Sequence, residues 1–272
     1  MSEAHQPAET KTLNQEVQAI WNQLATFWDG RMGEGNQFHR FLVEPTAERL
    51  LALQPGEQVL ELACGTGLFT RYMAALGARV TATDFSAGML EAAKARAAAS
   101  AERIEFRLVD VTDEAQLLSL GTHRFDAAVC NMALMDMAEI APLAQTMPHL
   151  LKQGGRFVFT IMHPCFNTVS PIMVMEEEDQ AGELVDTYSV KISQYRHARH
   201  MRGLGMPGQP VPQYYFHRSL TDLLAPWFQA GFALDALEEP TFDEQASSQR
   251  PLSWANFRDI PPVLAARLRL LR

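Results

Sequence analysis

Val59-Leu60-Glu61-Leu62-Ala63-Cys64-Gly65-Thr66-Gly67-Leu68-Phe69-Thr70 is the stretch from which the architecture of this chain can be predicted. It begins as a short apolar run and ends with two glycines one residue apart. An amphipathic helical pattern follows, and its apolar positions are Leu68, Tyr72, Met73 and Leu76. This order predicts a strand, a tight turn and a helix. Gly65 and Gly67 carry no side chain, so a nucleoside could lie against the main chain at this turn.

Two acidic residues distinguish this turn from an ordinary strand-to-helix connection that binds no ligand. Glu61 lies on the strand before the turn, and Asp84 ends the next apolar run, residues 79–84. Asp84 follows Gly65 by 19 residues, close to the ~20 expected for a carboxylate that binds ribose hydroxyls. The pattern therefore indicates a nucleoside-containing ligand at the ends of two neighbouring strands.

The spacing of the small residues discriminates between two cofactor classes. Dinucleotide enzymes use G-x-G-x-x-G, but Thr70 stands at the third position here. The order acidic-x-small-x-Gly-x-Gly, from Glu61 through Ala63 and Gly65 to Gly67, resembles motif I of the class I S-adenosylmethionine-dependent methyltransferases. That cofactor has an ammonium and a sulfonium but no phosphate, so an acidic residue on the strand is physically reasonable. A nicotinamide or flavin enzyme and a non-catalytic adenosyl-binding protein are the alternatives.

The resemblance implies the fold class. We expect an α/β, doubly wound, mostly parallel seven-stranded sheet of the Rossmann-like methyltransferase type, with a helical lid before it and an inserted cap after the fifth strand. The expected divisions are a tail and lid over residues 1–54, a cofactor-binding core over 55–163, the cap over 164–216 and the completion of the sheet over 217–272. Residues 1 to about 12 are expected to be disordered. Residues 260–268 are expected to form an antiparallel seventh strand, although their alanines and arginines also suit a helix.

The resemblance also implies a set of cofactor-binding residues. Asp110 followed by Val111, after an expected strand over residues 104–110, is similar to the motif in which a carboxylate accepts from the adenine amine; an aspartate there could instead cap the next helix. Asn131 and Met132 end a strand predicted over 125–131. The expected cofactor-binding set is Glu61, Ala63, Cys64, Gly65, Gly67, Asp84, Phe85, Met89, Asp110, Val111, Asn131 and Met132.

A helix with apolar positions from Ile140 to Leu151 is expected to end at Gly154-Gly155, before a fifth strand over residues 156–162. About fifty residues then intervene before the next helix, whereas such connections usually contain ~2–6 residues. The segment predicts an insertion containing a hairpin of residues 172–179 and 184–195. Its acidic run, residues 176–179, suits a solvated turn better than a metal site, and no metal is expected.

The acceptor pocket is expected beneath residues 29–39, which include three glycines, and beneath the insertion. The expected substrate-contacting residues are Trp28, Asn36, His39 and Tyr215. His163 and His217 are the candidate catalytic residues, because imidazole titrates near ~6.5 and can accept a proton at neutral pH. Each histidine could instead have a structural role.

Composition restricts the partners. The chain has 23 basic and 32 acidic residues, a net charge of −9, which disfavours nucleic acids and anionic membrane surfaces. Residues 1–16 are polar and lack the apolar core of a signal peptide. No apolar run is long enough to span a bilayer. The three cysteines lack the spacing of a metal site. We therefore expect a cytoplasmic enzyme that methylates an O, N, S or C atom of a small molecule. An RNA methyltransferase is the alternative, and the sequence does not predict an oligomeric state.

Overall fold

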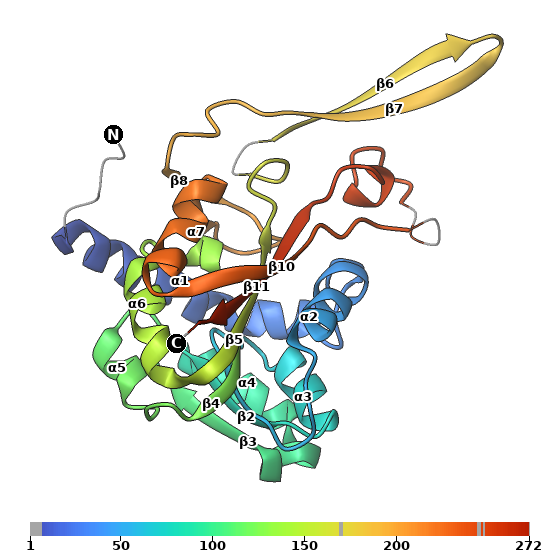
Figure 1. The fold of residues 1–272 in the computed structure, drawn as a ribbon. Helices are drawn as coiled ribbons and strands as arrows, with labels where there is room; N and C mark the ends of the chain where they lie inside the picture. The colour runs from blue at the N-terminus through green and yellow to red at the C-terminus, as the bar shows by residue number, and fades with distance from the viewer. Residues whose placement is uncertain (1–6, 169–170, 244–245, 247, 272) are drawn as a thin grey trace.

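The computed structural model describes residues 7–168, 171–243, 246 and 248–271, and its centre is a seven-stranded sheet (Figure 1). The strand order is β10-β11-β5-β4-β1-β2-β3. The strands are β1 (Gln58–Glu61), β2 (Arg79–Asp84), β3 (Ile104–Leu108), β4 (Phe125–Asn131), β5 (Leu151–Met162), β10 (Phe232–Glu238) and β11 (Val263–Leu270). All neighbouring pairs are parallel except those that involve β11. The predicted fold class is confirmed.

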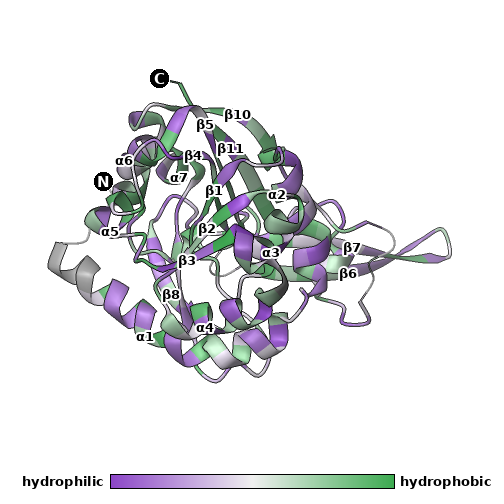
Figure 2. Ribbon diagram, turned by 90° about the horizontal axis from the view of Figure 1, so that it is seen from below, coloured by the Kyte–Doolittle hydropathy of each residue, from purple (hydrophilic) through white to green (hydrophobic). Residues whose placement is uncertain are grey.

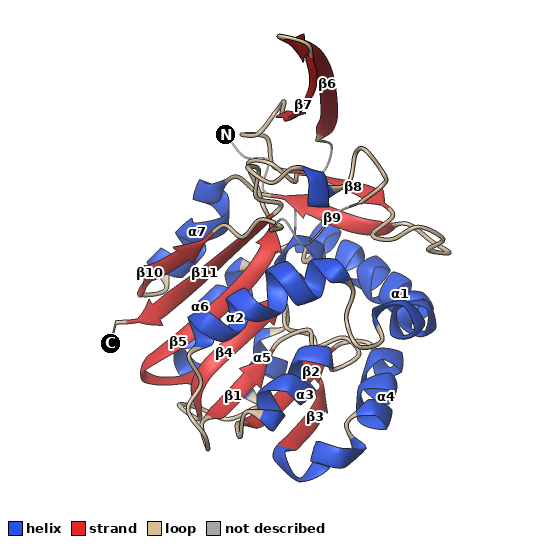
Figure 3. Ribbon diagram, turned by 90° about the vertical axis from the view of Figure 1, so that its right-hand side faces the viewer, coloured by secondary structure: helices blue, strands red, loops and turns tan. Residues whose placement is uncertain are grey.

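The central strands are buried on both faces, which is why they consist of nearly continuous apolar residues. Successive residues of β4 point to opposite sides of the sheet: Ala128 and Cys130 join one core cluster, and Ala127 and Val129 join the other. The helices α2 (Glu44–Leu51), α3 (Leu68–Ala75) and α4 (Ala87–Arg96) pack on the second side. The helices α5 (Glu114–Leu118), α6 (Ala141–Leu150) and α7 (Leu220–Gln229) cover the first (Figure 3). Figure 2 shows the apolar strands enclosed by helices with hydrophilic outer faces.

Strand β11 lies between β5 and β10 and runs antiparallel to both, as expected from the resemblance. Its alanines face closely packed neighbours on both sides of the sheet, and Arg267 and Arg269 bond to Asp235 on β10 at 2.8 and 2.9 Å. Tertiary packing thus overrides the helix propensity of this segment.

Segments before and within the sheet cover its carboxyl edge. Before β1 lie α1 (Pro7–Met32), a π-helix (His39–Val43) and α2. The insertion after β5 contains β6 (Ile172–Gln180) paired with β7 (Glu183–Lys191), and β8 (Arg199–Gly203) paired with β9 (Gln213–His217), each as a separate two-stranded sheet. The β6–β7 hairpin, which was predicted, extends away from the body of the molecule (Figure 1). None of the helices in the described residues is both long and apolar enough to cross a bilayer.

Three local predictions need correction. Helix α1 already begins at Pro7, so residues 7–12 are helical, while residues 1–6 lie outside the described part of the chain. Helix α6 ends at Leu150, and Gly154 and Gly155 belong to β5, where the pairing with β4 shifts register. A Cβ on Gly155 would lie 2.8 Å from the Lys152 carbonyl oxygen, so this glycine allows a bulge rather than a helix end. Strand β3 ends at Leu108, two residues before Asp110.

Candidate functional site

A cavity of 640 Å³ lies at the carboxyl ends of the parallel strands, where doubly wound sheets bind their ligands. This volume falls within the ~300–1,000 Å³ of small-molecule sites. Residues from the turn after β1, the ends of β2 and β4, the segment after β3, the N-terminal helices and the β8–β9 hairpin all line it. Segments far apart in the sequence therefore share one chamber.

The turn after β1 presents bare backbone to the cavity. Gly65 has φ +55° and lines the cavity, and a Cβ placed on it would meet no protein atom within 4 Å. Gly67 has φ +72° but does not line the cavity; a Cβ there would lie 3.0 Å from the Ala93 Cβ of α4. The first glycine thus leaves space for a ligand, and the second allows helix α4 to approach the turn.

Asp84 and Glu61 are buried carboxyls on either side of this turn. The Asp84 carboxyl accepts hydrogen bonds from the backbone N–H groups of Gly65 and Ser86, both at 2.9 Å, and burial raises its pKa to about 6. Thr70 donates its hydroxyl to Glu61, whose pKa burial raises to about 8. This bond gives Thr70 a function at the position where dinucleotide enzymes carry a glycine. Asp84 is not the helix cap, because the Ser86 hydroxyl caps α4 by accepting from the Met89 N–H at 3.3 Å.

Asp110 forms the far wall of this half of the cavity together with Val111. Its Oδ1 accepts from the backbone N–H and the hydroxyl of Thr112, at 2.8 and 2.7 Å. Helix α5 is capped by Asp113, so Asp110 is not a helix cap. On α1, Asn14 donates to the Thr112 hydroxyl at 2.9 Å, which ties the N-terminal helix to this loop.

At the end of β4, Asn131 and Met132 lie between the two halves of the cavity. The Asn131 Oδ1 accepts from the Thr160 hydroxyl at 3.1 Å, and its Nδ2 is buried without a protein partner. Met132 has φ +52°, an unusual backbone conformation for a residue with a side chain. Every predicted cofactor-binding residue except Gly67 lines the cavity.

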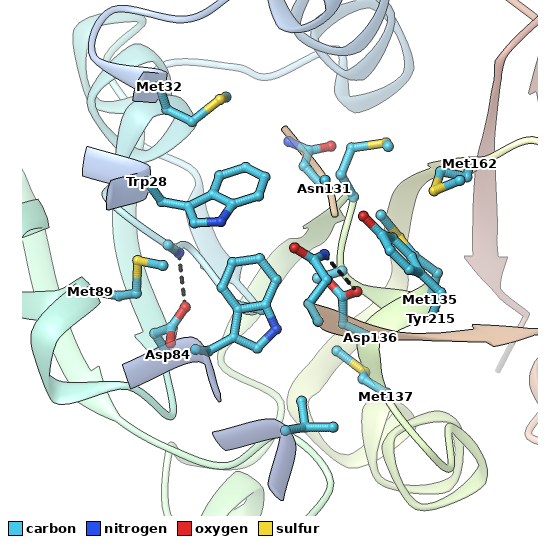
Figure 4. A pocket seen from close by; sticks show the side chains of 18 of the residues that line it. Trp28, Met32, Asp84, Met89, Asn131, Met135, Asp136, Met137, Met162 and Tyr215 are labelled. Atoms are coloured by element: carbon cyan, nitrogen blue, oxygen red, sulfur yellow. Dashed lines mark hydrogen bonds between the residues drawn. The ribbon is translucent and has the colours of Figure 1, made fainter. Parts of the chain in front are cut away.

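The other half of the cavity, around Tyr215, is lined mostly by apolar side chains. All four predicted substrate residues, Trp28, Asn36, His39 and Tyr215, line the cavity. Figure 4 shows Trp28 next to Met32 on the same side as Asp84 and Met89, and Tyr215 among methionine side chains on the other side. Burial lowers the pKa of His39 to about 4, so this histidine is neutral at pH 7.

Buried polar atoms without a protein partner gather around this cavity. They are the Trp28 Nε1, the Asn131 Nδ2 and the Gln213 Oε1. The His39 Nδ1 also has no hydrogen-bond partner, but it lies 3.9 Å from the Glu44 carboxylate. Buried polar groups are nearly always hydrogen-bonded, so the first three atoms point to a polar ligand inside the cavity.

The structure does not bring the two predicted catalytic histidines into this cavity. The His163 Nε2 bonds to Glu239 at 2.7 Å, and its Nδ1 accepts from the Cys165 N–H at 3.1 Å. The His217 Nδ1 is 2.7 Å from the Thr168 hydroxyl. Its Nε2 is 2.7 Å from the Tyr195 carbonyl oxygen. Both rings are buried and neither lines the main cavity, so we propose structural roles for both residues in place of the catalytic ones.

We expect His163→Asn and His217→Asn to leave the affinity for S-adenosylhomocysteine unchanged and to lower protein stability. Each substitution breaks hydrogen bonds of a buried ring, at a cost of ~1–3 kcal/mol. Calorimetric titration and thermal melting of the two variants measure these effects separately. Lost ligand binding in a variant that keeps the wild-type melting temperature would contradict the structural role.

Two residues that sequence reasoning missed complete the apolar half of the cavity. Asp136, from the 3-10 turn after β4, and Gln213, the first residue of β9, are both buried and line the cavity. The Gln213 Nε2 is 3.5 Å from the Asp136 Oδ1 (Figure 4). The only available signal was the position of Asp136 after a central strand, within a methionine-rich stretch that reads as core.

Comparison with known proteins agrees with this geometry. Residues 59–155 match a family model described as a methyltransferase domain. The chain is 39% identical over 110 residues to a demethylmenaquinone methyltransferase of Clavibacter sepedonicus, covering 40% of this chain and 43% of that protein. It is 35% identical over 107 residues to a ubiquinone biosynthesis O-methyltransferase of Xylella fastidiosa, covering 39% and 42%. The matches therefore span less than half the length of these two curated relatives.

Solved structures match over a greater length. An S-adenosylmethionine-dependent methyltransferase of Mesorhizobium loti superposes with a TM-score of 0.63 at 26% identity, covering 83% of this chain and 96% of that one. A protein of Listeria monocytogenes described as a putative S-adenosylmethionine-dependent methyltransferase gives a TM-score of 0.65 at 18% identity, covering 89% and 99%. The second match supports the fold alone.

Proposed function

We propose that this chain is a class I S-adenosylmethionine-dependent methyltransferase and that it transfers a methyl group from S-adenosylmethionine to an O, N, S or C atom of a small molecule. One observation carries the proposal. A single cavity joins a half lined by carboxyls and bare backbone to an apolar half lined by aromatic and methionine side chains. A cofactor and an acceptor can thus be held side by side.

The residues present fit this cofactor. Asp84 would accept from the ribose hydroxyls, and Asp110 and Val111 would contact adenine. The open space over Gly65 and the buried Glu61 would receive the amino acid part, whose ammonium is complemented by negative charge. When bound, the cofactor supplies a methyl group activated by a cationic sulfur.

The protein's own contribution is to position the two reactants and to exclude water. The indole rings of Trp21 and Trp28 lie 5.2 Å apart and line the cavity from α1. Holding two reactants in a reactive orientation can lower a barrier by up to ~7–11 kcal/mol. We therefore propose that the helices before β1, within residues 1–54, and the β8–β9 part of the 164–216 insertion are the covers that complete the site around the core, whereas the β6–β7 hairpin extends away from it.

The chemistry of the cysteines supports a reducing, cytoplasmic location, which we include in the proposal. Cys64, Cys130 and Cys165 are all free thiols, and the first two are buried. A small molecule is the proposed acceptor because the described residues that line the cavity include no lysine or arginine that could bind a nucleic-acid phosphate.

The proposal is tested by ligand binding and by methyl transfer. We expect S-adenosylhomocysteine to raise the melting temperature and NAD to leave it unchanged, because only a ligand of the native state stabilises it. A screen of small phenols, amines, thiols and carboxylates that detects S-adenosylhomocysteine should then reveal turnover. Stabilisation by NAD alone would overturn the proposal. Cofactor binding without turnover would indicate a non-catalytic adenosyl-binding protein, and salt-sensitive tRNA binding would favour an RNA methyltransferase.

A further inference from the structure

The cavity carries an unusual balance of charge for a site that binds a second substrate. Its described lining includes no lysine or arginine, and His39 is neutral at pH 7. Four lining residues carry carboxyl groups: Glu61, Asp84, Asp110 and Asp136. An anionic acceptor would lose its hydration here without gaining a cationic partner, and it would be repelled by any ionised carboxylate. The lining therefore selects acceptors that carry no negative charge.

Within the apolar half, Asp136 and Gln213 present oxygen atoms that can accept hydrogen bonds. The Gln213 amide donates from its Nε2 to Asp136, so its Oε1 is left buried and without a protein partner. Only 9% of Asp136 and 2% of Gln213 are exposed. Burial raises the pKa of Asp136, so its carboxyl is a pure acceptor only once it has ionised. In that form, two acceptor oxygens at one place suit a ligand that brings its own proton, such as a hydroxyl group.

Arg218 fixes the loop that carries Asp136. It follows β9 directly and donates hydrogen bonds to the carbonyl oxygens of Leu134, Met137 and Ala138, at 3.1, 2.6 and 2.9 Å. Burial lowers the pKa of Arg218 to about 10, so the guanidinium stays charged at neutral pH. Hydrogen bonds from a charged donor are stronger than those from a neutral one. Arg218 bonds to the backbone of the loop and leaves the carboxyl group of Asp136 facing the cavity.

The surroundings of Asp136 suit a ring-shaped apolar ligand. Met135, Met137, Met162 and Tyr215 lie around it in Figure 4, and all four line the cavity. Methionine side chains are flexible and make favourable contacts with aromatic rings. The titratable groups that interact with Asp136 electrostatically are Tyr215 from β9 and Cys130 from β4, and burial raises the pKa of both. A phenol and a thiol are either neutral or negatively charged, so neither group supplies a positive charge that would stabilise the ionised carboxyl of Asp136.

We propose, building on the methyltransferase function above, that the acceptor is an uncharged apolar molecule with a phenol-like hydroxyl, and that Asp136 removes the proton of this hydroxyl. The O–H bond breaks and its proton passes to a carboxylate oxygen of Asp136. The oxygen forms the new bond to the methyl carbon, and the bond from that carbon to sulfur breaks with its electron pair on sulfur. Asp136 then releases its proton to water. Gln213 orients the hydroxyl, and Arg218 is a positioning residue.

The test compares Asp136→Asn, which keeps the shape of the side chain, with Asp186→Asn as a matched control. Asp186 is an exposed residue on the β6–β7 hairpin. Phenols of graded acidity and their carboxylated analogues serve as acceptors. We expect the wild-type protein and the control to methylate the uncharged phenols and to reject the carboxylated ones. Asp136→Asn should lose ~10²–10⁴-fold in kcat, as is typical when a general base is removed.

Two readouts separate proton removal from a merely structural role. The affinity for S-adenosylhomocysteine should be the same in Asp136→Asn as in the wild type, which shows that the cofactor half is intact. The rate deficit should shrink for the more acidic phenols, because their O–H bond breaks more easily and their methylation depends less on a base. Burial raises the pKa of Asp136, so the wild-type rate should rise with pH as this carboxyl ionises, and the variant should lose that rise.

The inference is overturned if Asp136→Asn keeps the wild-type rate on every phenol, if the deficit is equal for all of them, or if carboxylated acceptors or amines are preferred. Failure of the wild-type protein to bind S-adenosylhomocysteine would instead remove the proposed function itself. The two failures are therefore distinguishable in the same set of measurements.

Discussion

Replacing Asp84 by alanine is expected to weaken the binding of S-adenosylhomocysteine by more than ~1.5 kcal/mol, roughly tenfold in the dissociation constant. The substitution removes a charged acceptor for the ribose hydroxyls. It also frees the backbone N–H groups of Gly65 and Ser86, which the carboxyl now binds at 2.9 Å. The turn after β1 would thus lose the carboxyl that accepts from the Gly65 N–H and holds the turn in place. Calorimetric titration of the folded variant measures the loss.

Ser86→Ala is the matched control for this experiment. It removes the hydroxyl that caps α4 and leaves the Asp84 carboxyl in place. The loss of a cap costs ~0.5–2 kcal/mol of stability, but cofactor affinity should change little. Equal affinities in the wild type and in folded Asp84→Ala would show that the carboxyl only holds the turn.

Cofactor affinity is expected to rise with pH, because the two carboxyls of this half are partly protonated without a ligand. Burial raises the pKa of Asp84 to about 6 and that of Glu61 to about 8. A cationic cofactor favours the ionised forms, so binding near pH 7 should release protons. Calorimetry in buffers of different ionisation enthalpy detects this release, and its absence would contradict the coupling.

The same shifts set the sign of the pH dependence of stability. The folded protein binds more protons at these two carboxyls than the unfolded chain, whose groups titrate at 3.8 and 4.5. Their contribution to the free energy of unfolding is therefore greatest at low pH and falls as pH rises from about 4 toward 8. The ligand should offset this loss, so cofactor stabilisation should increase over the same window.

The cofactor half could be predicted from the sequence because each contact follows directly from a strand. Gly65, Asp84 and Asn131 stand at or just after the ends of β1, β2 and β4, and parallel strands bring such ends to one edge. The backbone at a strand end restricts which residue types fit there, so a glycine, aspartate or asparagine at such a position indicates a binding residue. Local sequence therefore carries most of the information about this half.

The acceptor half could not be predicted in the same way because distant segments assemble it. Asp136 and Gln213 meet across 77 residues, and the connection is made by a hairpin outside the main sheet. His163 does leave the end of β5, but its ring turns toward Glu239. The direction of a side chain beyond a strand depends on its packing partners, which the periodicity of a sequence does not specify.

Gly65→Ala is expected to weaken cofactor binding at least tenfold while leaving the protein folded. The residue has φ +55°, where a Cβ is strained by ~1–2 kcal/mol. No protein atom lies within 4 Å of the added Cβ, so the folded protein accommodates it. The methyl group would, however, occupy cavity space against which the cofactor must lie. Titration with S-adenosylhomocysteine measures the loss, for which we expect more than ~1.4 kcal/mol, or tenfold.

Gly182→Ala is the matched control, which separates the loss of stability caused by backbone strain from the loss of cofactor affinity. Gly182 has φ +94° in the turn between β6 and β7, and a Cβ there also meets no atom within 4 Å. Both variants should lose a similar amount of stability, because both place a side chain in the left-handed region. Only Gly65→Ala should lose affinity, since only its Cβ enters the cavity. If the two variants bound the cofactor equally well, the space over Gly65 would not be where the cofactor lies, and the assignment of this half of the cavity would fail.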